Sequence, residues 1–253
     1  AKIEEKVREQ ISTAKAIYHL NIDILKELNP DFIVTQSLCE VCAVAEDEVQ
    51  EAVCELHGKA KIINLEPMTL QDVFDTLLLI GDETNHKRQA HKAVADLKER
   101  VDRVITTTER FIPETSRPKL VFLEWLDPHF NAGHWTPELI EYAGAISLLS
   151  NKHKPSTTLT WDKVVAANSD ILFIACCGYD LDRTLQDMSV LNEKKIWTQL
   201  KAIKNVYITD GNAYFSRPGP RLVDGLEIMA HALHPKVHSL PAGLLAAVNY
   251  KVT

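Results

Sequence analysis

The sequence predicts an α/β protein in which two parallel-sheet lobes are joined by one long helix, the first lobe being incomplete. Short apolar segments alternate with segments of helical periodicity, a pattern typical of parallel α/β units. The stretch from Asp82 to Arg110 contains neither Gly nor Pro. A helix of that length spans roughly 40 Å, which suits a rigid connector. We therefore expect an N-terminal lobe at 1–81, a spine helix at 82–112 and a C-terminal lobe at 113–253.

In the first lobe, apolar residues at helical spacing predict a helix over 3–28. Strands are predicted at Asp31–Gln36 and Lys61–Leu65, with a helix at 46–56 between them. A further helix is expected over 69–80. Only two strands are therefore readable in this lobe, and a sheet of two strands is marginal by itself.

The second lobe continues the alternation after two prolines that mark its start. Each strand is a short apolar run, and each helix follows a loop rich in polar or aromatic residues. In chain order the expected elements are strand Lys119–Trp125, helix Pro137–Ala143, a helix capped by Thr160, strand Ile171–Ala175, helix Leu181–Met188, strand Asn205–Thr209 and helix Arg221–Leu233.

Composition excludes several functional classes. Apolar residues make up 45% and charged residues 25%, which is ordinary for a globular protein. The net charge of −7, without any run of Lys or Arg, argues against binding to nucleic acid or an anionic membrane. No apolar run approaches the roughly 20 residues of a membrane helix. The N-terminal residues lack the apolar core of an export signal.

The chain has five cysteines, so at least one cannot pair within it. Free thiols in a reducing compartment are the simplest interpretation. The single CxxC at Cys39 and Cys42 is a weak zinc signal, since no second pair completes four ligands. We therefore expect no resident metal or cofactor.

Ligands of open parallel sheets bind beyond the carboxyl ends of the strands. The loops at that edge mix aromatic and polar residues, which suits a large, flat, partly polar ligand. Arg217 is suited to hold an anion or a carboxamide edge, and His134 to coordinate a metal within the ligand. Core packing of Trp125 and a structural role for His134 remain open. The candidate ligand-binding residues are Gln36, Cys39, Glu124, Trp125, Asp127, His134, Trp135, Cys177, Tyr179, Asn212, Tyr214, Phe215 and Arg217.

Enzymatic interpretations have less support. The sequence contains no GxSxG, P-loop, GxGxxG or HExxH motif. Glu124 and Asp127 are spaced as an acid/base pair, and Cys177 with His134 would make a nucleophile and its base. We predict a binding protein rather than an enzyme. An enzyme that uses Glu124, His134 and Cys177 on the same fold stays as an alternative.

Three long segments carry a family resemblance: FLEWLDPHFNAGHWTPELIEYAG, WDKVVAANSDILFIACCGYDLDRTL and DGNAYFSRPGPRLVDGLEIMAHALHP. They resemble the cobalamin-type substrate-binding proteins of ABC importers, within the iron-siderophore and cobalamin binding group of the helical-spine class. The stretch NPDFIVTQSLCEVCAV is similar to the first-lobe loop of that family. The resemblance extends from about residue 3 to 235.

The resemblance implies two α/β lobes on a spine helix, with cobalamin or a related corrinoid or metal chelate in the cleft between them. It implies delivery of that ligand to an ABC permease. Arg217 falls where relatives place an arginine beside the corrin periphery. Trp125, Trp135 and Tyr214 are the candidates for stacking on the ligand.

Two features depart from the family pattern. Relatives begin with a strand and a Pro-Ser/Ala-x-Thr-Glu loop, whereas this sequence starts beyond that point. A second copy of the chain could supply the missing sheet edge, so a homodimer, or an oligomerising module without a transport role, is a further alternative. The family implies a periplasmic or cell-surface location, whereas five cysteines and no visible signal leave a cytoplasmic relative open.

Overall fold

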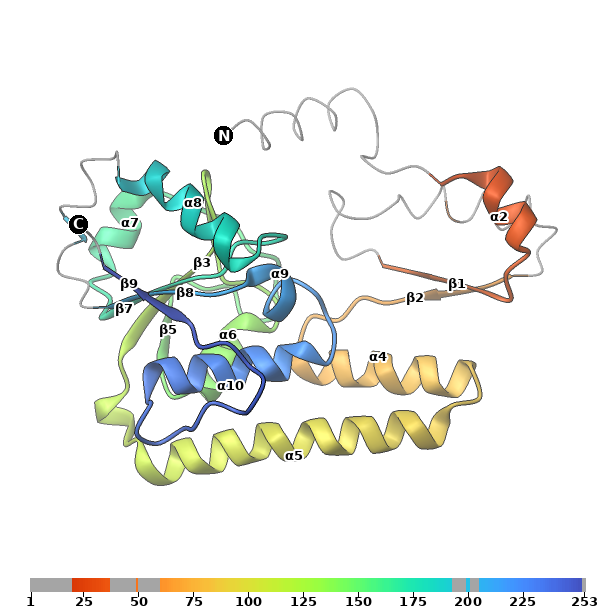
Figure 1. Cartoon of the computed structure of the whole chain (residues 1–253), viewed down its shortest axis with the longest axis horizontal. Helices are drawn as coiled ribbons and strands as arrows, with labels where there is room; N and C mark the ends of the chain where they lie inside the picture. Colours follow the sequence, from red (N-terminus) through yellow and green to blue (C-terminus); the bar gives the residue numbers. More distant parts are fainter. Residues whose placement is uncertain (1–19, 37–48, 50–59, 193–198, 201–204, 252–253) are drawn as a thin grey trace. The chain divides into compact units, whose positions relative to one another are not determined.

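A computed structural model describes residues 20–36, 49, 60–192, 199–200 and 205–251 (Figure 1). The chain divides into two compact units, 1–67 and 68–253. Most of the helices predicted at 3–28 and 46–56 lies outside the described residues. In the part that is described, no helix is long and apolar enough to cross a membrane.

The described part of the first unit contains a helix and two paired strands. Helix α2 (Ile22–Leu28) begins at Asn21, whose side-chain oxygen accepts a hydrogen bond from the Ile24 amide at 3.1 Å. Strands β1 (Phe32–Thr35) and β2 (Lys61–Asn64) pair in parallel, with Phe32 opposite Lys61. Both strands predicted for this lobe are therefore confirmed.

The second unit is built on a mixed sheet, whose described strands follow the order β6-β4-β3-β7-β8-β9, with β5 also on β3. Its centre is parallel, as the sequence predicts: β3 (Lys119–Leu126), β7 (Ile171–Ile174) and β8 (Asn205–Ile208). Four strands were not predicted, because each has only two or three residues and lacks an apolar run. They are β4 (His129–Asn131), β5 (Ile146–Leu148), β6 (Thr158–Leu159) and β9 (Val248–Tyr250), of which β4 and β9 run antiparallel to their neighbours β3 and β8.

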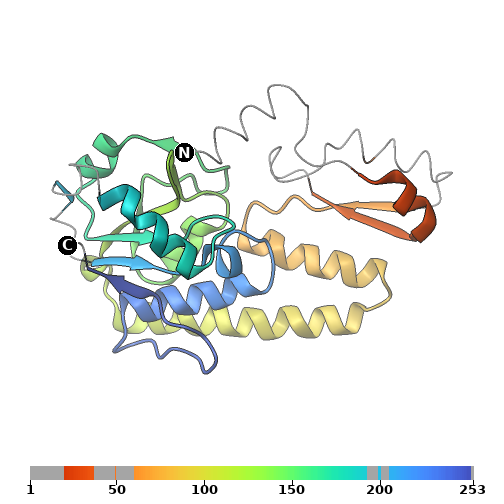
Figure 2. The same cartoon turned by 45° about the horizontal axis from the view of Figure 1, so that its top comes forward.

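The helices of the second unit follow the predicted alternation, apart from a short helix at Gly211–Tyr214 that was not predicted. Thr160 stands at the N-cap position of α7, as expected, but its side chain makes no capping hydrogen bond. Helices α4 and α5 lie side by side in both views (Figures 1 and 2). The helices are α4 (Leu70–Glu83), α5 (Lys87–Phe111), α6 (Thr136–Tyr142), α7 (Trp161–Ala166), α8 (Leu181–Asn192), α9 (Gly211–Tyr214) and α10 (Arg221–Leu233), with a short 3₁₀ turn at Glu114–Ser116.

The spine helix α5 starts at Lys87 rather than at the predicted Asp82. Helix α4 continues to Glu83, and the chain then turns at Asn85, which has a positive φ of 60°. The turn lets α4 fold back on α5, and a Cβ on Gly81 would lie only 2.3 Å from Cβ of Ala90. An asparagine can adopt this left-handed conformation, so the turn needs no Gly or Pro of its own. The predicted start of the spine helix at Asp82 is therefore corrected to Lys87. Helix α4 falls in the second unit.

An ion-pair cluster joins the spine to helix α10. The guanidinium of Arg100 on α5 donates to Asp224 Oδ1 at 2.5 Å and to both carboxylate oxygens of Glu227. Glu227 is 8% exposed. The hydrogen bond to Glu227 raises the pKa of Arg100, so this group stays charged. A partly buried cluster of this kind is costly to break from one side, because the remaining carboxylates lose their cation.

We expect Arg100→Ala to lower the free energy of unfolding by about 2 to 3 kcal/mol, since it leaves two carboxylates without their cation. Arg103→Ala is the matched control, because Arg103 forms an exposed pair with Glu99 on the same helix. That control should change stability by less than about 1 kcal/mol. Urea unfolding followed by circular dichroism measures both, and equal losses would contradict the assignment.

Three histidines lie near the C-terminal end of the spine helix α5. His238 Nε2 lies 3.0 Å from Thr108 Oγ1 on α5, and His234 Nε2 lies 3.1 Å from the Gly144 carbonyl. His231 Nδ1 lies 2.8 Å from the His238 carbonyl. Burial lowers the pKa of His234 and His238, and the charges of His234 and His231 further lower that of His238. Both rings are therefore neutral in the folded protein near neutral pH.

This geometry predicts that acid destabilises the second unit. The unfolded chain binds protons near the ordinary histidine pKa of 6.5, whereas the folded chain takes them up only at lower pH. The free energy of unfolding should therefore be greatest above that pH and fall as the pH drops below it. Chemical unfolding between pH 7.5 and 5 measures the slope. His238→Gln should flatten it, and His91→Gln, which changes an exposed histidine, should not; equal slopes in both variants would contradict the prediction.

Candidate functional site

The carboxyl ends of β3, β7 and β8 lie at one edge of the second unit's sheet, because the three strands are parallel. The loops that follow them bring together most of the candidate residues predicted for this lobe. Among these, Trp125 and Tyr179 make the closest ring contact, with centroids 4.8 Å apart and planes tilted by 55°. The Trp125 indole N–H donates to the Asp127 carbonyl at 3.1 Å, which fixes that ring. Both side chains are partly exposed.

A positive charge that the sequence analysis missed lies beside this ring pair. Arg183, one helical turn after Tyr179, places its guanidinium carbon 5.1 Å from the centre of the tyrosine ring. Asp187 holds the same guanidinium at 3.3 Å. Burial raises the pKa of Tyr179, although the hydrogen bond with Arg183 opposes this. The spacing of four residues between Tyr179 and Arg183 is the signal that could have indicated the contact.

Two polar residues that follow β8, Asn212 and Arg217, extend the site from the ring pair of Trp125 and Tyr179. The Asn212 amide donates to the Tyr179 carbonyl at 3.0 Å. Asn212 Oδ1 accepts two hydrogen bonds from Arg217, from Nε at 3.1 Å and from Nη2 at 2.8 Å. A guanidinium has five N–H donors, so on this exposed side chain three have no partner among the described residues and suit an anion or an amide oxygen. We call Trp125, Tyr179, Asn212 and Arg217 the Tyr179 patch.

Glu124 supports the site from inside. Its Oε1 accepts the Gly133 amide at 2.9 Å, and its carbonyl accepts the Cys177 amide at 2.8 Å. Burial raises the pKa of Glu124, while hydrogen bonds from Gly133, Ser156 and Thr136 act in the opposite direction. The carboxylate is thus engaged in holding the loop between β4 and α6. Cys177 itself is exposed.

Two predicted ligand-binding residues, of which Trp135 was also a stacking candidate, lie in the core. Trp135 and Phe215 are each 3% exposed. The Trp135 indole donates to the Phe215 carbonyl at 2.9 Å. The Phe215 ring packs against Phe122 and Phe173, with centroids 5.3 and 5.9 Å away. Both side chains therefore fix the loops from the core, and neither presents a ring at the surface.

His134 is placed differently from the prediction. Its Nε2 atom is buried and has no hydrogen-bond partner among the described residues, and burial lowers the pKa of the ring. This atom does not face the surface, so the geometry gives no support to coordination of a ligand's metal by His134. Within the described residues, no cluster of three His, Cys, Asp or Glu side chains could hold a metal ion.

The remaining candidates do not join the Tyr179 patch. Asp127 and Tyr214 are partly buried in the loops after β3 and β8. Gln36 follows β1 in the first unit, where it is also partly buried. Cys39 lies outside the described residues.

The sequence of this chain is similar to those of known binding proteins. A family model described as periplasmic binding protein matches residues 2–214. The vitamin B12-binding protein of Pectobacterium atrosepticum is 23% identical over 224 residues, which cover 87% of this chain and 72% of that protein.

Solved structures share the fold. A periplasmic heme binding protein from Pseudomonas aeruginosa matches with a TM-score of 0.72 at 17% identity, covering 97% of this chain and 87% of that one. An ABC transporter substrate-binding protein from Listeria monocytogenes matches with a TM-score of 0.70 at 16% identity, covering 85% and 81%. These matches confirm the predicted fold class.

Proposed function

This chain belongs to the periplasmic binding protein family, and on that premise we propose that it captures cobalamin, or a related corrinoid or metal chelate, for import through an ABC permease. Members of the family are substrate-binding proteins of ABC transporters and generally not enzymes. They work in the periplasm or outside the cell, where we propose that this chain meets its ligand. The proposed role needs no resident cofactor.

The Tyr179 patch is the observation that supports this choice of ligand. Partly exposed rings are linked through Asn212 to Arg217, three of whose N–H donors have no partner among the described residues. Rings favour contact with a broad conjugated face, and a guanidinium favours oxygen atoms at its edge. Corrins and related tetrapyrroles combine a wide ring system with amide or carboxylate groups on its periphery. The relative from Pectobacterium, described as binding vitamin B12, points to the corrinoid.

The alternatives have less support. The enzyme hypothesis needs Glu124 and His134 as reacting groups, but Glu124 holds the Gly133 amide and His134 Nε2 is buried. The neighbouring Cys176 is not a ready nucleophile, because burial raises its pKa to about 12. The expected homodimer gains no support from the family or from the structures that share the fold.

Cyanocobalamin added to the protein should quench tryptophan fluorescence saturably, because Trp125 lies in the patch. Arg217→Ala should weaken binding by about tenfold, the cost of a lost charge-assisted hydrogen bond. Arg88→Ala, which changes an exposed arginine on α5, is the control and should leave affinity unchanged. No quenching at high micromolar cobalamin would reject this ligand. Saturable binding of heme instead would keep chelate capture and overturn the corrinoid.

The ring of Tyr179 should matter more than its hydroxyl. Tyr179→Phe keeps the face that lies against Trp125 and should bind within about threefold of the wild type. Tyr179→Ala removes it and should weaken binding by about tenfold or more. Isothermal titration with cyanocobalamin compares the two variants. Equal affinities for the two would show that the tyrosine ring is not part of the binding surface.

A further inference from the structure

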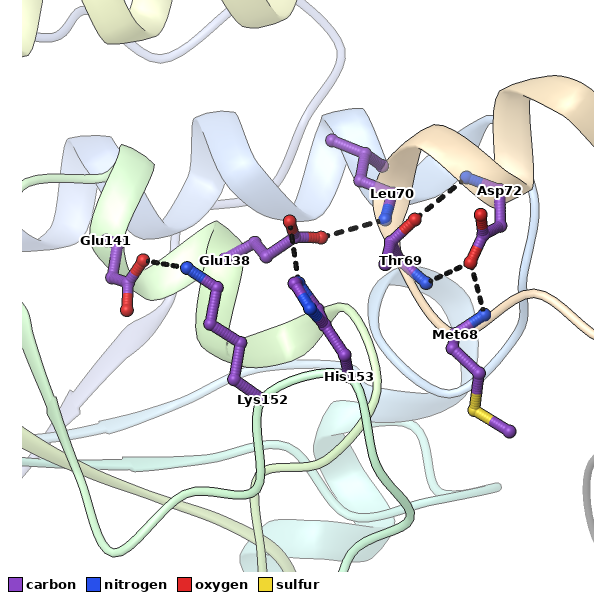
Figure 3. Close-up of polar contacts among 8 residues, drawn as sticks. All are labelled: Met68, Thr69, Leu70, Asp72, Glu138, Glu141, Lys152 and His153. Carbon is purple, nitrogen blue, oxygen red and sulfur yellow. Dashed lines mark hydrogen bonds and ion pairs between the residues drawn. The ribbon is translucent and has the colours of Figure 1, made fainter.

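The start of helix α4 is held by a group of polar contacts within its first turn and from α6 (Figure 3). Met68 is the first residue of the second unit. The carboxylate of Asp72 accepts the amides of Met68 and Thr69, each at 2.9 Å, and the Thr69 hydroxyl accepts the Asp72 amide at 3.0 Å. This capping box satisfies the first amides of the helix from within its own turn. The Leu70 amide, at the first helical position, needs an acceptor from elsewhere.

Glu138 on α6 supplies that acceptor. Its Oε2 accepts the Leu70 amide at 2.9 Å, and the two residues are 9% and 3% exposed. Its other oxygen, Oε1, lies 3.0 Å from Nε2 of His153 (Figure 3). A carboxylate at a helix N-terminus is also favoured by the helix dipole. One buried side chain therefore joins the loop after β5 and its own helix α6 to the start of α4, which lies 68 residues earlier in the sequence.

The same loop is bonded to the loops of the candidate site. His153 donates its amide to the His134 carbonyl at 3.1 Å, and His134 donates its amide to the Lys154 carbonyl at 2.7 Å. Both histidines have a positive φ, 59° for His153 and 50° for His134. This conformation is costly for a residue with a side chain, so the surrounding contacts must hold both residues in place.

Glycine permits the close approach of these two loops. A Cβ on Gly133 would lie 2.4 Å from the backbone nitrogen of Ser156. Gly133 donates its amide to Glu124, whose carbonyl accepts the Cys177 amide at 2.8 Å, two residues before Tyr179. Hydrogen bonds, together with the short stretches of chain between them, thus connect the first turn of α4 to the loop that carries the patch.

We propose that Glu138 is a positioning residue that couples the Tyr179 patch to the start of α4, directly after the boundary between the two units. The part of this proposal that concerns ligand binding rests on the proposed function. Occupancy of the patch stiffens the loops at His134 and His153, and Glu138 passes this constraint to the Leu70 amide. Thermodynamic reciprocity requires that loosening the start of α4 weakens ligand binding in turn.

Hydrogen exchange on the full chain without ligand tests the first half of this proposal. Glu138→Gln should speed exchange of the Leu70 amide by about tenfold, because a charged acceptor is lost from a buried donor. Glu141→Gln is the matched control: Glu141 lies on the same helix and pairs with Lys152 at 2.6 Å, with about two-fifths of each side chain exposed. The control should leave Leu70 exchange unchanged. Equal exchange in the wild type and Glu138→Gln overturns the proposal whatever the ligand does.

Exchange with saturating cyanocobalamin tests the coupling. The wild type and Glu141→Gln should gain protection at Leu70, whereas Glu138→Gln should gain none and bind severalfold more weakly. His153→Asn separates coupling from local support, since asparagine tolerates the positive φ but cannot span the distance to Glu138. Leu70 exchange without ligand should stay near the wild-type rate in this variant, while the protection by ligand is lost; retained protection overturns the coupling. If cobalamin fails to bind at all, the proposed function fails and the coupling to this ligand fails with it, while the exchange without ligand still decides the placement of Glu138.

Discussion

The hydrogen bond from the Trp135 indole to the Phe215 carbonyl is the contact on which the arrangement of the site depends. It joins the segment between β4 and α6 to the end of α9 beneath the surface. Phe215 is further held by Phe122 and Phe173 of the central strands. Rings buried in this way contribute several kcal/mol each, far more than the exposed contact of Arg217 with Asn212. The residues of the Tyr179 patch can therefore be partly exposed, because buried contacts of Trp135 and Phe215 hold the surrounding loops in place.

The order of the central elements was predictable because each satisfies a simple rule. Strands β3, β7 and β8 are short and largely apolar, with β7 buried along its whole length, and α10 begins and ends at the predicted residues. The four missed strands have two or three residues each, and they form through pairing with neighbours rather than through their own pattern. The turn at Asn85 was missed for a related reason. Its backbone conformation is permitted by asparagine, but only the packing of Gly81 against Ala90 makes it necessary.

The site was predictable in position and less so in the role of each residue. The edge of a parallel sheet selects this region, and Trp125, Tyr179 and Asn212, which the sequence proposes as candidates, lie in contact there. An aromatic residue in such a loop can either face the ligand or anchor the loop, and the sequence carries no signal that separates the two. Trp135 and Phe215 take the second role. Glu138 and Arg183 act through partners distant in the chain or one helical turn away, so composition and motifs did not single them out.

The patch is arranged so that little order remains to be created on binding. A free arginine side chain loses up to about 2 kcal/mol of rotamer entropy when it is fixed, and Arg217 is already held by two hydrogen bonds to Asn212. Asn212 is bonded through its amide to Tyr179, whose ring is held by Trp125 on β3 and by Arg183 on α8. The same connected contacts thus position both the polar groups and the aromatic rings that contact a ligand. A ligand that needs both a flat face and a peripheral oxygen gains from that shared support, because each group that is fixed in advance reduces the entropy lost on binding.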